Sequence, residues 1–441
     1  MLCKLNSEAS KATDLLKAID AGSESWWLKI AEQGTPLIEE CADHRVWVTF
    51  LWRDPAGDES CSELARVYID VNSVTDHHRA DPQSLVRMAG SDIWYWQVQL
   101  PADWRGSYCL MPVAASRLPD FSALAAAEQA SDQRSWWRSI AEAAEADPLN
   151  LQSPRAGAWR SAMSALHLPK APPQTAWRCA DGQDKGDLAA LKLLDWHSAM
   201  LANQRRVWVY QTGEPDGDRA LVLLLDGQHW AERMPVYPAI DRATADGQLP
   251  AAVYVLIDAI DGGQRSLELP CNPQFWQAVQ SELLPLIQQI APCSDQPERT
   301  VIAGQSYGGL SAMYAALHWP ERFGCVLSQS GSFWWPYHDI LKMPLNQPAI
   351  RKPGSRGRLA EELPGLAPAA RALKVFQEAG SREDVMIDVN ETMRDALVQA
   401  GHQVSYRLFE GGHDWLCWRG GLLDGLSELL ANQYPAEVSP F

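Results

Sequence analysis

Strand and helix patterns alternate through the C-terminal half of the chain, and this alternation restricts the fold more than any other feature. Runs rich in valine, isoleucine and leucine recur at residues 205–212, 220–227, 251–260, 299–305, 323–331, 372–380 and 403–412. Helical patterns follow some of these runs, at residues 272–290, 307–320, 387–401 and 420–432. Strands that are apolar throughout are typical of parallel sheets covered by helices on both faces. We therefore expect an α/β fold with a mostly parallel sheet.

The first third of the chain has a different pattern, in which side chains alternate with a period of two. This alternation appears at residues 45–52, 65–72, 92–100 and 106–113, and a helical composition follows at 124–137. Short alternating strands with turn residues between them are typical of antiparallel sandwiches. We expect an all-β, immunoglobulin-like sandwich domain over residues 1–150, a linker or wrapping segment over 151–190, and the α/β domain over 191–441.

Composition argues against several classes of partner and location. The formal net charge is -17, so we expect no binding to nucleic acid or to anionic membranes. The nine cysteines contain no CxxC pair and indicate neither a disulfide framework nor a zinc site. The first residues lack the apolar segment of a signal peptide, and no apolar run approaches the ~20 residues of a membrane span. We expect a cytoplasmic protein, with a monomer favoured.

The segment VIAGQSYGGLSAMYAAL places Ser306 between Gly304 and Gly308, in the pattern Gly-x-Ser-x-Gly. A strand pattern precedes the serine, and apolar residues with helical spacing follow it. In hydrolases this arrangement forms a sharp turn that lifts the serine hydroxyl clear of the sheet. The small glycines let neighbouring backbone pass close to that turn. The context indicates that Ser306 is a nucleophile.

A serine hydroxyl is a poor nucleophile until a base removes its proton. In this architecture an acid and then a histidine follow the serine along the chain. His413 comes just after the last strand pattern, in the sequence FEGGHDW, and is our candidate for the base. Other histidines after the serine are less well placed relative to strand ends, namely His318, His338 and His402.

The acid should follow the strand pattern at 372–380, where a carboxylate would hold the imidazole in one tautomer. Three carboxylates occur in or just after this pattern. We favour Glu383, three residues after Gly380, then Asp384 and then Glu378.

Two backbone N–H groups should stabilise the oxyanion. One is that of Tyr307, directly after the nucleophile, and the other comes from the loop that begins near Gln228. His229 in that loop has no partners at metal-ligand spacing, so we expect no metal site.

Several long blocks of the second half resemble the enterochelin esterases, also called ferric enterobactin esterases. These blocks are LLLDGQHW, YVLIDAIDGGQRSLELPCN, GQSYGGLSAMYAALHWPERFGCVLSQSGSFWWP, EAGSRED and GGHDWLCWRGGL. The N-terminal half resembles, more diffusely, the sandwich domain of these enzymes. The resemblance implies an α/β-hydrolase catalytic domain that opens the trilactone of ferric enterobactin, or of a related catecholate siderophore, to dihydroxybenzoyl-serine units in the cytoplasm. It also implies a nucleophile at Ser306, a base at His413, and no cofactor, because iron enters with the substrate.

The implied substrate is anionic and carries catechol rings, so an acidic protein needs locally placed cations and aromatic faces. Arginine offers planar donors to oxygen atoms and stacks on rings. The candidates near strand ends are Arg265, Arg382 and Arg419, with salt bridges as the structural alternative. The aromatic candidates, which are equally suited to a core, are Trp230, Trp335 and Trp415, with Trp334 and Trp418.

Two other functions stay open from the sequence. One is a feruloyl or acetyl esterase that acts on carbohydrate-linked esters, with the sandwich as a sugar-binding module. The other is a non-catalytic siderophore-binding protein with the same fold. An assay of ester hydrolysis together with a binding titration would separate these functions.

Overall fold

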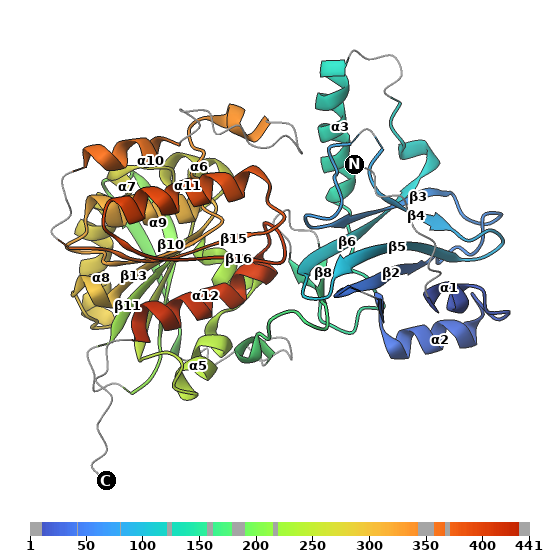
Figure 1. Ribbon diagram of the computed structural model, residues 1–441, viewed down its shortest axis with the longest axis horizontal. Coiled ribbons are helices and arrows are strands. Elements are labelled where there is room, and N and C mark those ends of the chain that lie inside the picture. The colour runs from blue at the N-terminus through green and yellow to red at the C-terminus, as the bar shows by residue number, and fades with distance from the viewer. Residues whose placement is uncertain are drawn as a thin grey trace, which may run out of the picture. The chain divides into compact units, whose positions relative to one another are not determined.

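The computed structural model describes residues 11–41, 43–79, 81–120, 126–156, 162–178, 190–214, 219–342, 357–366 and 371–431. The chain forms two compact units, Met1–Pro173 (unit 1) and Gln174–Phe441 (unit 2), which are shown in Figure 1. Across the described ranges, none of the helices combines the length and the apolar character that crossing a membrane requires.

In the described part of unit 1, eight strands form one antiparallel sheet. Their order is β1 (Leu37–Glu40), β2 (Arg45–Arg53), β5 (Ile93–Pro101), β4 (Ser84–Arg87), β3 (Leu64–Val71), β6 (Arg105–Ala114), β8 (Ala162–His167) and β7 (Arg155–Ala156). The sheet folds over its own core. Phe50 on β2 contacts Tyr108 on β6, with ring centroids 4.9 Å apart, although three strands separate β2 from β6 in the sheet. The four strands expected from alternation are β2, β3, β5 and β6.

The described part of unit 1 also contains three α-helices, two of which we did not expect from the sequence. They are α1 (Lys11–Leu16), α2 (Glu24–Gln33) and α3 (Ala126–Ala141). The helix α2 begins at Ser23, whose hydroxyl accepts a hydrogen bond from the Trp26 N–H and so satisfies a free backbone donor. It buries Trp26, Trp27 and Ile30 on one face. Only α3 coincides with a helical pattern that we read from the sequence.

The end of unit 1 differs from the boundary expected at residue 150. The strand β8 pairs with β6, with Arg105 opposite His167 and Tyr108 opposite Ser164, and the division between units falls after Pro173. The sequence of β8, AMSALH, is rich in alanine and serine, so its alternation is too weak to recognise. Of the expected linker over 151–190, residues 157–161 and 179–189 lie outside the described residues.

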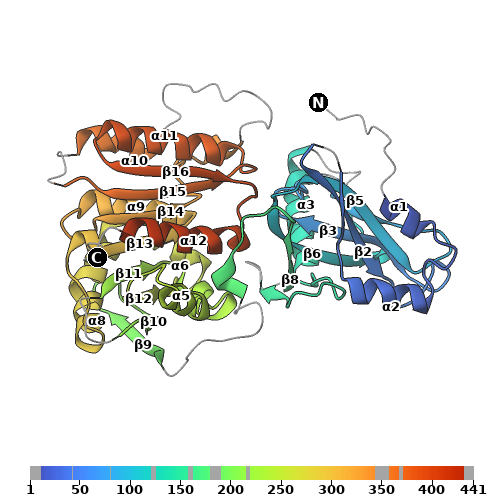
Figure 2. The ribbon, with the colours of Figure 1, turned by 60° about the horizontal axis from the view of Figure 1, so that its bottom comes forward.

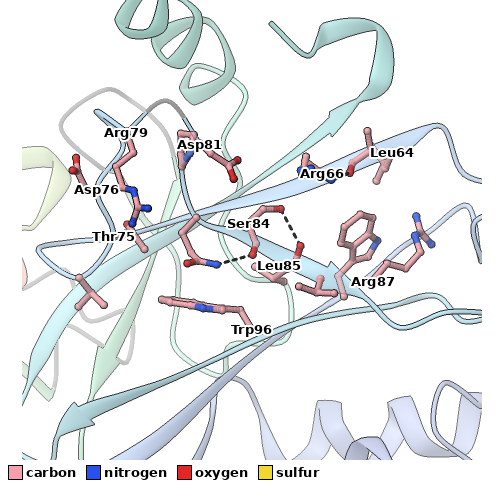
Figure 3. A pocket seen from close by; sticks show the side chains of 16 residues that line it. Leu64, Arg66, Thr75, Asp76, Arg79, Asp81, Ser84, Leu85, Arg87 and Trp96 are labelled. Atoms are coloured by element: carbon pink, nitrogen blue, oxygen red, sulfur yellow. Dashed lines mark hydrogen bonds between the residues drawn. The ribbon is translucent and has the colours of Figure 1, made fainter. Parts of the chain in front are cut away.

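A cavity of about 670 Å³ opens in unit 1 beside β4 (Figure 3). The strand β4 pairs with only two residues of β3 and two of β5, so the sheet is open at this place. Trp96 and Leu85 line the cavity together with the charged side chains of Arg66, Arg79 and Asp81. Every residue predicted for catalysis lies outside this cavity, in unit 2.

In the described part of unit 2, eight strands form a mixed and mostly parallel sheet. Their order is β16 (Gln403–Phe409), β15 (Lys374–Gly380), β14 (Cys325–Gln329), β13 (Thr300–Gln305), β11 (Ala220–Leu224), β12 (Ala252–Ile257), β10 (Asn203–Gln211) and β9 (Lys192–Ser198). The six strands from β16 to β12 are parallel, whereas β10 and β9 are antiparallel. Each strand but β9 lies within, or largely within, a run that we expected. The strand β9 is mostly exposed, and we did not predict it.

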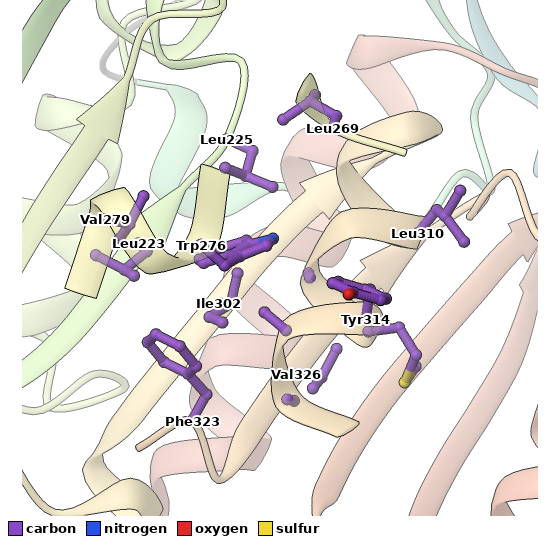
Figure 4. Close-up of a cluster of buried hydrophobic side chains, with 14 of the residues drawn as sticks. Leu223, Leu225, Leu269, Trp276, Val279, Ile302, Leu310, Tyr314, Phe323 and Val326 are labelled. Atoms are coloured by element: carbon purple, nitrogen blue, oxygen red, sulfur yellow. The ribbon is translucent and has the colours of Figure 1, made fainter. Parts of the chain in front are cut away.

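Helices cover both faces of this sheet (Figures 1 and 2). One face carries α7 (Pro273–Ala278), α8 (Leu284–Ile290), α9 (Tyr307–His318), α10 (Arg358–Glu362) and α11 (Val385–Gln399), and the other carries α5 (Tyr237–Ala245) and α12 (Trp415–Leu430). The short helix α6 (Gly262–Glu268) follows β12. Figure 4 shows the first face, where Trp276 packs near Ile302 and Tyr314. Two buried layers of side chains therefore pack the sheet between helices.

Candidate active site

Ser306 occupies a tight turn between β13 and α9. Its φ is +57°, which is the left-handed region that non-glycine residues rarely adopt. A Cβ atom on Gly304 would lie 2.3 Å from the backbone of Gly308, so only glycine fits at the first position of the motif. The turn leaves Ser306 partly exposed at the carboxyl end of β13. This is the geometry that presents a hydroxyl for reaction.

The end of β14 and the segment after it hold this turn in place. The Ser306 N–H donates to the Gln329 carbonyl at 3.0 Å, and the Ser332 N–H donates to the Ser306 carbonyl at 3.0 Å. The Ser332 hydroxyl also lies 3.1 Å from the Ser306 hydroxyl. Sequence reasoning missed Ser332. The signal was a polar run, QSGS, directly after a buried strand.

His413 and Glu383 are joined by a short hydrogen bond. The His413 Nδ1 atom lies 2.6 Å from Glu383 Oε2, and their side chains are 41% and 2% exposed. An ionised carboxylate only accepts hydrogen bonds, so Nδ1 is the donor to Glu383, and in the neutral form of the ring Nε2 is then the nitrogen with the lone pair. His413 follows β16 and Glu383 follows β15, at the sheet edge where Ser306 follows β13. These three residues therefore come from loops at one edge of the sheet.

The other two acid candidates have different surroundings. Glu378 is fully buried and bonds to Arg407 at 2.8 Å and to the Gln329 amide at 2.5 Å. Burial raises the pKa of Glu378, in opposition to the Arg407 charge. Asp384 directly precedes α11, and burial raises its pKa. Of the three candidates, Glu383 is the one that the structure brings against His413.

Ser330 was also missed from the sequence. Its hydroxyl donates to Glu383 Oε1 at 2.5 Å and accepts from the Trp418 indole N–H at 3.0 Å. The Trp418 ring packs edge-on against His413, with centroids 4.6 Å apart. The structure thus places Trp418 behind the histidine, where the residue is 2% exposed, so of its two alternatives the structure favours a place in the core over a contact with substrate.

The predicted oxyanion groups lie on two loops. Tyr307 begins α9, so its N–H is one of the unpaired donors of a helix N-terminus. The Gln228 side chain accepts a hydrogen bond from the Ala259 N–H at 3.0 Å, which ties the loop after β11 to the loop after β12. A Cβ atom on Gly308 would lie 3.4 Å from Asp226, so the loop after β11 packs against the first turn of α9.

Arg265 braces the turn at Ser306. Its guanidinium makes two hydrogen bonds to Asp226, at 2.6 and 2.7 Å, and a longer one to the Gln305 carbonyl at 3.3 Å. It also lies 5.6 Å from the centre of the Tyr307 ring. Although burial opposes the charged form, Asp226 raises the pKa of Arg265. The sequence suggested a substrate contact, but the structure gives this charge to Asp226.

The two other arginine candidates differ in exposure. Arg382 pairs with Glu410 at 2.7 Å and is 28% exposed. Arg419 is buried, donates to the Gln174 side chain at 2.6 Å and lies over the Trp177 ring. Burial lowers the pKa of Arg419 to about 9. The expectation that Arg419 meets substrate is therefore corrected, because its side chain faces the interior of unit 2.

The tryptophan candidates divide in the same way. Trp230 is fully buried in the core between the sheet and α12, which corrects its predicted substrate contact. Trp415 is partly exposed and stacks on His229, with centroids 3.5 Å apart. Trp335 is partly exposed beside Arg358, and Trp334 is buried. Trp335 and Trp415 are the candidates that keep an accessible surface.

Comparison with known proteins gives the family. Residues 198–429 match a family model described as putative esterase, and residues 47–177 match one described as enterochelin esterase, N-terminal. Among the groups of His, Cys, Asp and Glu in the described ranges, none could hold a metal ion.

Two curated relatives and one solved structure are similar over nearly the whole chain. An iron(III) enterobactin esterase of Dickeya dadantii is 50% identical over 96% of this chain and 97% of its own. One of Escherichia coli is 45% identical over 94% of this chain and 98% of its own. A crystal structure of the enterobactin esterase of Shigella flexneri in the presence of enterobactin is 45% identical, with a TM-score of 0.81, over 94% of this chain and 100% of that chain. The chain belongs to the enterochelin esterase family.

Proposed function

We propose that this protein is a serine esterase that hydrolyses the trilactone ester bonds of ferric enterobactin, or of a related catecholate siderophore, to dihydroxybenzoyl-serine units. The observation that carries the proposal is the 2.6 Å pair of His413 and Glu383 at the sheet edge that also presents the strained Ser306. The curated relatives from Dickeya dadantii and Escherichia coli are named for this substrate and support the choice.

The mechanism uses three side chains and the backbone. The Ser306 Oγ atom attacks a lactone carbonyl while His413 Nε2 takes the hydroxyl proton, and Glu383 stabilises the resulting imidazolium. The Tyr307 N–H, with a second N–H from the loop at Gln228, stabilises the oxyanion. As the C–O bond breaks, His413 gives its proton to the departing serine hydroxyl of the substrate. Water then attacks the acyl-enzyme by the same route, which frees the acid and restores Ser306.

The proposal also includes an α/β-hydrolase catalytic domain, an immunoglobulin-like sandwich and a cytoplasmic location. The strand order of unit 2, and an acid after β15 with a histidine after β16, support an α/β-hydrolase catalytic domain. The folded-over antiparallel sheet supports an immunoglobulin-like sandwich in unit 1. Cysteines without a disulfide, including Cys61, Cys109, Cys271 and Cys325, support a reducing, cytoplasmic location.

Replacement of the nucleophile tests the proposal. Ser306→Ala should lower the rate of ferric enterobactin hydrolysis by at least about 10³-fold, because the acyl-enzyme cannot form. Ser281→Ala changes an exposed serine of the same unit, in the helical segment Val279–Leu283, and is the control. Chromatography of the linear products, together with a titration of substrate binding, separates a lost reaction from lost binding. Full turnover by Ser306→Ala would remove the nucleophile from the mechanism.

The same assay separates the other functions. A feruloyl or acetyl esterase would hydrolyse its aryl or acetyl ester faster than ferric enterobactin. A binding protein would bind the siderophore without releasing dihydroxybenzoyl-serine.

A further inference from the structure

Ser330 is a buried residue that the mechanism above does not use. It follows β14, directly beside the loops that carry Ser306 and Glu383, and its side chain is fully shielded from solvent. Its hydroxyl lies between the Trp418 indole at 3.0 Å and Glu383 Oε1 at 2.5 Å. The second oxygen of the same carboxylate holds His413. Ser330 therefore contacts the acid from the side opposite the histidine.

The direction of these hydrogen bonds is fixed by chemistry. An indole N–H only donates, so Ser330 Oγ accepts from Trp418. The hydroxyl then has its own hydrogen to give, and the Glu383 carboxylate accepts it. The Gly380 N–H donates to the same Oε1 atom at 2.7 Å. Two donors thus fix one carboxylate oxygen, which leaves Oε2 aimed at the His413 Nδ1–H.

The backbone conformation of Ser330 is a second, independent observation that supports a functional role for its hydroxyl. Its φ is +48°, a conformation that glycine adopts without strain and serine does not. A strained residue held by its surroundings at an active site points to a role in function. A serine at this position supplies what glycine lacks, which is the donor to Glu383.

We infer that Ser330 is a positioning residue of the esterase, which orients the Glu383 carboxylate and, with Trp418, the His413 ring. The inference rests on the proposed function for its kinetic readout. Loss of the hydroxyl frees the carboxylate to rotate and the imidazole to leave its tautomer-fixing hydrogen bond. Because a small misplacement of catalytic groups costs on the order of 10²-fold, we expect kcat to fall roughly 10- to 100-fold, with KM nearly unchanged.

Two substitutions separate the hydroxyl from the backbone strain. Ser330→Ala removes the hydroxyl and keeps the strain, whereas Ser330→Gly removes both, so equal losses of kcat identify the hydroxyl. Trp418→Phe removes the indole N–H and keeps an aromatic ring against His413. Combined with Ser330→Gly, it should add little to the loss of kcat that Ser330→Gly causes alone. Ser328→Ala is the matched control, because Ser328 is buried on β14 and its hydroxyl makes no hydrogen bond within the described ranges.

The readouts are steady-state hydrolysis of ferric enterobactin and the proton resonance of His413 Nδ1–H by NMR. The resonance should lie far downfield in wild type and in Ser328→Ala, and move upfield in both Ser330 variants. Full kcat with an unchanged resonance in Ser330→Gly would overturn the inference, as would equal losses in Ser328→Ala. If Ser330→Ala does not fold, Ser330→Gly and Trp418→Phe still test whether Ser330 positions Glu383 and His413. If wild type fails to hydrolyse ferric enterobactin, the proposed function is wrong, but the resonance still tests the positioning.

Discussion

His229 should make the protein less stable in acid, and one substitution should remove this effect. The residue lies in the π-helical turn His229–Arg233 after β11 and is 3% exposed. Its ring stacks on Trp415, and within the described ranges its Nε2 atom has no hydrogen-bond partner. Burial, assisted by the charge of Arg233, lowers the pKa of His229 from 6.5 to about 3. The folded protein therefore holds this ring neutral in mild acid, whereas the unfolded chain protonates it.

The size of the effect follows from this difference in pKa. A group whose folded pKa is lowered contributes stability that is present above its unfolded pKa and is lost as the pH falls toward the folded value. Between pH 8 and pH 5 the unfolded chain gains most of a proton at His229, and the folded chain gains almost none. Proton linkage then predicts that this residue alone lowers the free energy of unfolding by about 2 kcal/mol over that interval. Because pH 5 lies well above the folded pKa, the unfolded value sets this magnitude.

Equilibrium unfolding in urea at pH 8 and pH 5 measures the effect. His229→Phe keeps a flat ring against Trp415 and cannot be protonated, so its loss of stability between the two pH values should be about 2 kcal/mol smaller than that of wild type. His197→Gln, which changes an exposed histidine on β9, is the control and should behave as wild type. The urea dependence of unfolding should be the same in all three proteins. Equal losses in wild type and His229→Phe would refute the reasoning.

Three further predictions concern the turn at Ser306 and the residues around it. Glu383→Gln should lower kcat by roughly 10³- to 10⁴-fold in steady-state hydrolysis, because an amide neither fixes the tautomer nor stabilises the imidazolium; a small loss would favour a pair without an acid. Gly304→Ala places a methyl group 2.3 Å from backbone atoms and should cost more than about 2 kcal/mol in thermal or urea unfolding, whereas Gly262→Ala, with open space at its Cβ, should cost far less. Arg265→Gln should reduce hydrolysis of ferric enterobactin and of a neutral aryl ester by the same factor, because the guanidinium is paired with Asp226. A selective loss on the ferric substrate would instead indicate direct contact.

Much of unit 2 could be predicted from the sequence because its strands are apolar throughout. The strands β11 to β15 are buried in the sheet and read as continuous runs, so their positions were clear. The edge strand β9 has a mixed composition that depends on its pairing with β10, and no local signal revealed it. The same holds in unit 1 for β8, which pairs with the distant strand β6, with Arg105 opposite His167. The strand β4 has only four residues, too few to show an alternation.

Some residues of the candidate site could be recognised from local sequence patterns, and others could not. Ser306 lies in a Gly-x-Ser-x-Gly motif at the end of β13, and Glu383 and His413 lie in the loops just after β15 and β16, so local patterns were enough to propose them. Ser330 and Ser332 could be recognised only once the order of strands in the sheet showed that their loop lies beside those of Ser306 and Glu383. Burial explains the errors: Arg419 and Trp230 lie near site motifs in sequence, but their side chains face the core.

The proposed catalytic residues and Ser330 follow successive strands, and this placement has a consequence for a divided chain. Ser306 and Ser330 follow β13 and β14, whereas Glu383 and His413 follow β15 and β16. A polypeptide cut between β14 and β15 would leave the proposed nucleophile on one fragment and its proposed base on the other, so we expect neither fragment to hydrolyse the ester alone. If mixing the fragments restored turnover, this complementation would indicate that β14 and β15 had paired in the correct register.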